Sequence, residues 1–438
     1  MNHRSSSISL LALGLSIYGA STLTSMALMG IGLGILAACY GLALKNGQIL
    51  PGPLLEIDTA TKKRYAVISA ALASACLISL IGAWAFPVHY AGRGPRLQWG
   101  ADLSKLGYFA LPLFLAHLFS RLPQKEFARV VRIWLLFAGL ISFIAIPQFF
   151  TGWPRPQGIP EFSGHFHATL FFGHHLSTAS ILIFPCFLAL SLAASSWFRK
   201  SPRAREPGAD EFQIGLNPII LTLIGTLGVI ALFLTWSRMV WIALPLGLGV
   251  WIFRYFNRRT AAALIGAIAL AGLIGVPQIP QLRNRLSSTM GTSDRFELWR
   301  ANIAFFETRP WTGIGWKKAE GLTTAYYEEV YGGDASRRFV GHAHNNFLDV
   351  LSGTGLIGAF TWIAWSLLIF QMSWILSRRR DSWGELGWAY FCAWIVFQIN
   401  GLTQVNFWEG KVMHQVMWGA ALILFSSAAT TRSDSRKN

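Results

Sequence analysis

Apolar segments long enough to cross a membrane recur along most of this 438-residue chain, and this repetition constrains the fold more than any other feature. A helix needs roughly 20 mostly apolar residues to span the hydrocarbon core of a bilayer. We count about 12 such segments, near residues 7–22, 24–44, 65–86, 105–120, 130–149, 168–194, 216–235, 239–253, 260–276, 354–376, 385–402 and 411–428. The pattern predicts an all-α integral membrane protein with about 12 transmembrane helices.

The charged residues agree with this class and indicate an orientation. They make up only 13% of the chain, against about 25% in typical soluble domains. A net charge of +17 would suggest nucleic acid in a soluble protein, but 22 of the 37 Lys and Arg lie near the termini or in alternate gaps between apolar segments. Lys and Arg gather in the cytoplasmic loops of membrane proteins. We therefore expect cytoplasmic termini, contact with membrane lipid and no nucleic-acid partner.

One gap between the apolar segments is much longer than the others. It covers residues 277–343, and the alternation of loops places it on the outer side of the membrane. Loops of this length are uncommon unless they carry a function. The predicted layout is nine transmembrane helices in residues 1–276, the large outer loop in 277–343, three transmembrane helices in 344–428 and a cytoplasmic tail in 429–438.

The large loop contains the pattern of a short amphipathic helix. Asp294 with Glu297 three residues later is typical of a helix start. Apolar residues then recur at helical spacing: Phe296, Trp299, Ile303 and Phe306. The Arg-Pro pair at 309–310 should end the helix, and Gly313 and Gly315 predict a turn. We expect this helix to lie near the outer membrane surface.

A polar cluster immediately after the loop is the strongest candidate for chemistry. It contains His342, His344, Asn345 and Asn346, directly before an apolar segment. A neutral imidazole can accept a proton near pH 7, and the two amides are suited to hydrogen bonds with a sugar. Two alternatives are capping of the helix that follows and, less well supported because no carboxylate or thiol cluster accompanies the histidines, a metal site.

Arginines at two further places are candidates for binding phosphate. Ser237 and Arg238 interrupt apolar sequence, and an arginine at membrane depth is either functional or extends to the interface. Arg295 and Arg300 belong to the loop helix, with Trp299 one turn from Arg295. The planar guanidinium group matches pairs of phosphate oxygens, whereas the alternative for the loop arginines is a solvated surface.

A second group of histidines precedes the apolar segment that ends near residue 194. Its members are His165, His167, His174 and His175. We expect these side chains to line a polar cavity or to cap a helix, and a metal site is the weaker alternative.

Short motifs in a fixed order resemble a known family. The chain carries Thr235-Trp-Ser-Arg238, then Arg295-Phe-Glu-Leu-Trp299 with Pro310 and Gly313-Ile-Gly315-Trp316, then His344-Asn-Asn-Phe-Leu with Gly355-Leu-Ile-Gly358. Over roughly residues 220–365 these resemble the O-antigen ligase and polymerase superfamily of bacterial inner membranes, and within it they look most like the O-antigen ligases. The spacing to Asn-Asn-Phe-Leu favours His344 over His342 as the family histidine.

This resemblance implies a glycosyltransferase of lipopolysaccharide biosynthesis. Such proteins move a glycan from undecaprenyl pyrophosphate to a sugar of the lipid A core on the periplasmic face, with inversion and without metal or cofactor. His344 would then be the catalytic base, and Arg238, Arg295 and Arg300 would bind the donor pyrophosphate. The residues expected to contact substrate are His342, Asn345, Asn346, Trp299, Ser237, His174 and His175.

Alternative functions remain open at this stage. An O-antigen polymerase or a protein O-oligosaccharyltransferase of the same superfamily would share the donor and differ in the acceptor. The short chain after His344 disfavours the protein-modifying type. A transporter or flippase would also fit about 12 spans, but we find no similarity between the two halves of the sequence.

Overall fold

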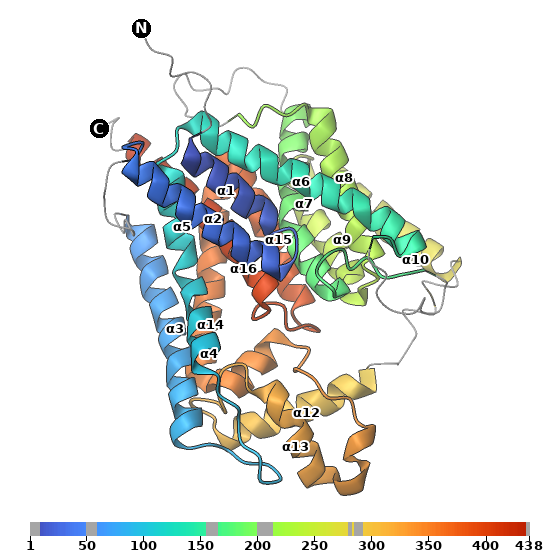
Figure 1. Ribbon diagram of the computed structural model, residues 1–438. Helices are drawn as coiled ribbons and strands as arrows, with labels where there is room; N and C mark the ends of the chain where they lie inside the picture. The colour runs from blue at the N-terminus through green and yellow to red at the C-terminus, as the bar shows by residue number, and fades with distance from the viewer. Residues whose placement is uncertain are drawn as a thin grey trace.

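The computed structural model describes residues 9–49, 59–154, 165–198, 213–278, 283 and 292–434, and these residues are helical with irregular connections (Figure 1). Over these residues β-structure is limited to one isolated bridge between Tyr90 and Arg93. The predicted all-α class is therefore confirmed.

Each predicted apolar segment overlaps a helix in the structure. Up to the large loop the elements are α1 (Leu10–Ser21), α2 (Met26–Lys45), α3 (Ala60–Ala85), α4 (Trp99–Leu106), η1 (Gly107–Phe109), α5 (Leu111–Ser120), α6 (Gln124–Thr151), α7 (His175–Phe198), α8 (Pro218–Leu234), α9 (Arg238–Ile252) and α10 (Arg258–Gln278). They continue with α12 (Thr292–Thr308), α13 (Ala319–Tyr331), η3 (Gly332–Arg337), α14 (Asn346–Ser377), α15 (Ser382–Asn400) and α16 (Gly410–Asp434).

Several helices are long and apolar enough to cross a membrane. Within the described ranges there are five, or six if the pair Trp99–Phe109 and Leu111–Ser120, bent by 45°, is one span. The protein is thus a multi-pass membrane protein, while the count of 12 spans and the outer location of the large loop stay predictions.

Two predicted segment boundaries were wrong. The segment 105–120 is divided by the bend before Leu111. The segment 168–194 begins as a helix only at His175, because residues 165–174 form irregular turns with positive φ at Leu170 and Gly173. The segment 354–376 begins at a break in α14, since the backbone at Gly355 is not helical, and a further helical stretch from Asn346 precedes it.

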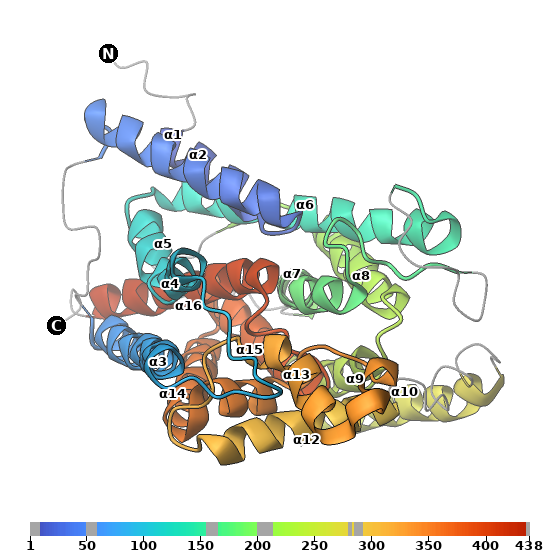
Figure 2. The same ribbon diagram turned by 60° about the horizontal axis from the view of Figure 1, so that its bottom comes forward.

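The helices are arranged in three rough layers, which lie one below another in Figure 2. One outer layer contains α1, α2 and α6, the middle one α5, α16, α7 and α8, and the third α3, α14, α15 and α9. Helix α7 is the most enclosed of the candidate spans, with 94% of its apolar window buried. Trp134, Trp365, Trp394 and Trp418 fill the contacts between layers, and burial of such large rings contributes strongly to stability.

Helix α14 is broken at Gly355, where φ is +64° and ψ is −164°. The Gly313–Gly315 turn of the large loop lies against this break. The Ile314 N–H donates to Ser352 O at 3.0 Å, and the Leu356 N–H donates to Pro310 O at 2.8 Å. Backbone groups that the break leaves unpaired within α14 thus form hydrogen bonds with the loop, and these bonds fix the loop to the bundle.

The large loop forms its own small helical layer from α12, α13 and η3 (Figure 1). As predicted, α12 ends just before the Arg-Pro pair, and Gly313 and Gly315 have positive φ. The buried face of α12 contains Leu298, Ala301 and Phe305. Of the four apolar residues that predicted the helix, Phe296 is 54% and Ile303 45% exposed, while Trp299 and Phe306 are half-buried.

This layer covers one end of the bundle. Bonds between Asn346 N–H and Gly401 O, and between Asn400 and Ser180, place the starts of α14 and α7 and the end of α15 at that end. The polar cluster at 342–346 therefore lies between the bundle and the loop helices. The start of α1 and the last turns of α16 lie toward the opposite end (Figure 1).

Candidate active site

His344 lies in a tight turn immediately before α14. Its φ of +47° is in the left-handed region, which is costly for a residue other than glycine. Its backbone N–H donates to Nδ1 of His342 at 3.2 Å, and the two ring centroids are 4.2 Å apart. Strain of this kind persists only where neighbouring contacts hold it, and it is concentrated at functional sites.

Hydrogen bonds determine which nitrogen of each imidazole carries the proton. Nδ1 of His344 lies 3.3 Å from Oε1 of Gln404, and because an amide oxygen only accepts, Nδ1 donates. The neutral His344 ring therefore has its lone pair on Nε2. In His342 the lone pair is on Nδ1, where it accepts the backbone N–H of His344. Of the two basic nitrogens, only Nε2 of His344 takes no part in these two hydrogen bonds.

Both histidines are neutral at pH 7. Burial, the neighbouring His342 and the positive charge of Arg295 lower the pKa of His344 to about 3. Burial, with smaller effects of His174 and Lys317, lowers the pKa of His342 to about 4. The resting site thus contains uncharged imidazole next to cationic groups, a state that a bound anion would change.

The two asparagines hold the turn in place. Asn345 caps α14, because its Oδ1 accepts the Leu348 N–H at 3.1 Å, and its Nδ2 donates to Leu402 O at 3.0 Å. Asn346 is 2% exposed. Its Oδ1 accepts the Asn406 N–H at 3.0 Å, and its Nδ2 donates to Asn406 Oδ1. The capping interpretation is confirmed for Asn345, and the amide of Asn346 is occupied in joining α14 to the loop before α16.

Two cations from the large loop lie near the histidines. Arg295, in the first turns of α12, is close enough for its charge to depress the pKa of His344. Lys317 has φ +59°, and its Nζ donates to the carbonyl of Trp408 at 2.5 Å. Burial lowers the Lys317 pKa to about 8, so the ammonium form predominates at neutral pH. The structure therefore brings Arg295 and His344 together.

Ser237 and Arg238 lie where α8 turns into α9, at the same end of the bundle. Trp236, just before them, has φ +59°. The carbonyl of Leu234, at the end of α8, accepts a hydrogen bond from the Ala168 N–H. Ser237 is 2% exposed, and over the described residues its hydroxyl has no hydrogen-bond partner. Arg238 is half-buried at the first position of α9.

Arg300 and Trp299 occupy different surroundings from Arg295. Arg300 has a 70% exposed side chain and pairs with Glu297 at 3.4 Å on the outer side of α12. Its position therefore does not support the predicted phosphate contact. Trp299 is half-buried and packs edge-on against Phe296, with ring centroids 5.3 Å apart.

The second histidine group borders the site from α7. The ring of His174 is 4.8 Å from that of His175, centroid to centroid. Burial lowers the pKa of His174, while the charge of Glu409 acts in the opposite direction. Over the described residues no group of three or more His, Cys, Asp or Glu side chains is arranged to hold a metal ion.

Three polar residues near the site were missed by sequence analysis: Gln404, Glu409 and Lys411. Glu409 accepts hydrogen bonds from the Ser177 hydroxyl at 2.6 and 2.7 Å and pairs with Lys411 at 3.0 Å. The sequence does contain a signal for two of them, because Glu409 and Lys411 are the only Asp, Glu, Lys or Arg residues between Glu385 and Arg432. Nothing in the sequence marks Gln404, whose importance comes from its contact with His344.

These features define a class: a multi-pass helical membrane protein with a polar site of neutral imidazole and cations, enclosed between its bundle and a helical loop. Residues 223–363 match the family model described as O-antigen ligase. The chain is also 28% identical over 193 residues to an O-antigen ligase of Pseudomonas aeruginosa. Over these residues the chain is similar to O-antigen ligases.

The coverage of these matches is partial. The aligned region is 44% of this chain and 42% of the Pseudomonas protein, so the chain spans about two fifths of the curated relative it matches. The family match includes Arg238, Arg295 and His344 but ends before Gln404 and Glu409.

Proposed function

We propose that this protein is an O-antigen ligase that acts at the periplasmic face of a bacterial inner membrane, with both termini cytoplasmic. It transfers the O-antigen glycan from undecaprenyl pyrophosphate to a sugar hydroxyl of the lipid A core. The reaction inverts the anomeric centre and needs no metal. The single observation that carries the proposal is the neutral His344, oriented by Gln404 and lying beside Arg295.

His344 is the general base. Its Nε2 accepts the proton of the acceptor hydroxyl while the hydroxyl oxygen forms a bond to the anomeric carbon of the donor sugar. The bond from that carbon to the pyrophosphate oxygen breaks, and its electron pair stays on the leaving group. Because the oxygen attacks the face opposite the leaving group, the configuration inverts. Gln404 Oε1 stabilises the imidazolium by accepting its Nδ1–H.

Arg295 and Arg238 bind the pyrophosphate. Negative charge on this group grows as the glycosidic bond breaks, and fixed guanidinium groups stabilise it more in the transition state than in the ground state. Donor binding also prepares the base. The pyrophosphate offsets the charge of Arg295, so the pKa of His344 rises from its low resting value. His344 thus gains basicity only when the donor is in place.

The substrate lipids fit the surroundings of this site. The prenyl chain of the donor extends into the bilayer beside the apolar helices, and the exposed Phe296 and Ile303 of α12 rest on the lipid surface. His342, His174, His175, Ser237 and Trp299 border the space between bundle and loop and contact the substrates. The ammonium group of Lys317 adds a positive charge near His342.

A reconstituted transfer reaction tests this function. The purified protein in lipid nanodiscs receives undecaprenyl-pyrophosphate-linked glycan and lipid A core, without an ion gradient and with or without EDTA. We expect glycan-bearing lipid A core at the same rate in both conditions. Elongated lipid-linked glycan without transfer to core would instead identify a polymerase, and dependence on a divalent cation would refute the metal-free mechanism.

A further inference from the structure

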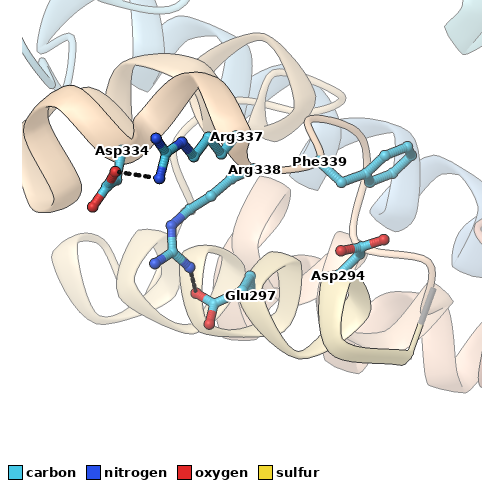
Figure 3. A pocket seen from close by; sticks show the side chains of 6 residues that line it. All are labelled: Asp294, Glu297, Asp334, Arg337, Arg338 and Phe339. Carbon is cyan, nitrogen blue, oxygen red and sulfur yellow. Dashed lines mark ion pairs between the residues drawn. The ribbon is translucent and has the colours of Figure 1, made fainter. Parts of the chain in front are cut away.

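We propose that a pocket in the large loop, next to His344, binds a sugar ring of one of the two glycans. This inference rests on the proposed glycan transfer and adds a binding site to it. The loop pocket has a volume of about 340 Å³ and lies between the start of α12 on one side and η3 with the residues directly after it on the other (Figure 3). It is lined by Asp294, Glu297, Asp334, Arg337, Arg338 and Phe339.

The loop pocket adjoins the candidate base. Phe339 lines the pocket, and its ring centroid is 6.2 Å from that of His344. On the other side Asp294 immediately precedes Arg295, whose charge acts on His344. A glycan held in the pocket therefore has its neighbouring sugar within reach of the histidine.

The lining has the chemistry of a sugar site. Carboxylates accept hydrogen bonds from hydroxyl groups, guanidinium groups donate to ring and hydroxyl oxygens, and an aromatic face packs against the C–H surface of a pyranose. With three acidic and two basic side chains, the lining does not favour a phosphate. The cationic side chains near His344, Lys317 among them, favour a phosphate instead. The two regions therefore accept different parts of a substrate.

The walls of the pocket are fixed before a ligand binds. Glu297 accepts the Tyr331 hydroxyl at 2.7 Å and pairs with Arg338 at 3.1 Å. The Arg338 guanidinium carbon lies 3.5 Å from the centroid of the Tyr331 ring. Because these contacts orient the inner carboxylate and guanidinium in advance, a sugar that bonds to them loses little free energy in ordering the protein.

The mouth of the pocket is open to solvent. Asp334 and Arg337 form an ion pair of 3.4 Å there, with 69% and 84% of their side chains exposed. Figure 3 shows this pair and the Glu297–Arg338 pair around the same space as Phe339. The volume is near the lower end of the range of about 300–1,000 Å³ for small-molecule sites, which suits one part of a longer chain that leaves through the mouth.

The sugar ring comes either from the acceptor core or from the donor glycan, since both are rich in hydroxyl groups. The probes are core oligosaccharide released from lipid A and repeat-unit glycan released from its carrier. Binding of each to the full-length protein in nanodiscs is measured by saturation-transfer NMR, together with KM in the transfer reaction. The test variants are Phe339→Ala and Asp294→Asn.

Matched controls lie on the same loop helices outside the pocket. They are Val330→Ala, which removes a 50% exposed apolar side chain of α13, and Glu307→Gln, which neutralises an exposed carboxylate of α12. We expect each test variant to weaken binding and raise KM by about tenfold for one of the two glycans. The glycan affected identifies the source, and both controls should match the wild type.

Two outcomes separate this inference from the proposed function. If the wild type transfers glycan while the test variants bind both probes normally and have unchanged KM values, the sugar pocket is refuted and the transferase function stands. If the wild type binds one probe in a way that depends on Phe339 and Asp294 but transfers nothing, the transferase function is refuted and the sugar pocket stands.

Discussion

Nδ1 of His344 lies 3.3 Å from the side-chain oxygen of Gln404, a residue 60 positions later in the chain. This contact joins the start of α14 to the segment between α15 and α16, and it directs the lone pair of the neutral imidazole to Nε2. Gln404 is itself 2% exposed, so its position is fixed by packing. The orientation of the proposed base therefore depends on a residue outside the family match, which ends at residue 363.

Replacing Gln404 tests whether this orientation matters. We expect Gln404→Ala to lower kcat by about 10- to 100-fold, the usual effect of losing a partner that orients a histidine. Gln404→Glu keeps an acceptor for Nδ1–H, and its negative charge raises the pKa of His344, so activity should return in part and the acid limb of the pH–kcat profile should move to higher pH. Identical profiles for the wild type and Gln404→Glu would contradict a positioning role.

Arg295 and Arg300 form a matched pair on α12, with one near His344 and the other on the outer side. We expect Arg295→Ala to lower transfer by about 100-fold or more, in the range found when a charged transition-state contact is removed. Arg300→Ala should retain transfer within about threefold, because an exposed ion pair contributes little. In addition, loss of the Arg295 charge should raise the pKa of His344, which NMR of labelled histidine can detect. Equal losses in the two variants would contradict the assignment.

The depressed histidine pKa values predict how stability depends on pH. An unfolded histidine titrates near pH 6.5, whereas His342 and His344 in the folded protein titrate at about 4 and about 3. Below about pH 6.5 the unfolded state therefore binds protons that the folded state does not, and the free energy of unfolding falls as the pH decreases. Thermal unfolding in detergent at pH 7.5 and pH 5 should show this loss, and it should be smaller in the double variant His342→Gln/His344→Gln. An unchanged loss would mean that other groups cause it.

The contact between the glycine turn and the break in α14 should be sensitive to a single methyl group. In Gly313→Ala the added carbon meets the carbonyl group of Gly353, and φ is already +67°. We expect destabilisation by at least about 1–3 kcal/mol and reduced transfer, because the loop that carries Arg295 shifts. Gly321→Ala in α13 is the control, since its methyl group enters open space. Thermal unfolding and transfer rates of the two variants provide the comparison.

Local patterns allowed much of the fold to be predicted. Apolar length located the helices, helical spacing with the Arg-Pro pair located α12, and the two glycines located the turn at 313–315. These features depend on residues close together in sequence. The break at Gly355 was not predicted, because a glycine inside an apolar segment is tolerated in a continuous helix and the break is stabilised by distant backbone groups at 310–314.

The candidate site shows the same limit. His344 and Arg295 were singled out by residue type and motif, and the structure brings them together. The outer position of Arg300 could not be predicted, since it depends on which face of α12 packs against α14. Asn346 was expected to contact a sugar, but its amide bonds to Asn406, a long-range contact. Gln404 has no signal in the sequence because its role comes entirely from its neighbour.

Side-by-side transfer rates of His344→Ala and His342→Ala, with purified protein at pH 7.5, show which of the two imidazoles is the base. His344 has the basic nitrogen oriented away from its fixed hydrogen bonds, whereas His342 uses its own to hold the His344 backbone. We predict that His344→Ala abolishes transfer with normal folding and donor binding, while His342→Ala retains a measurable rate. Full activity in His344→Ala, or the reverse ranking of the two variants, would contradict this prediction.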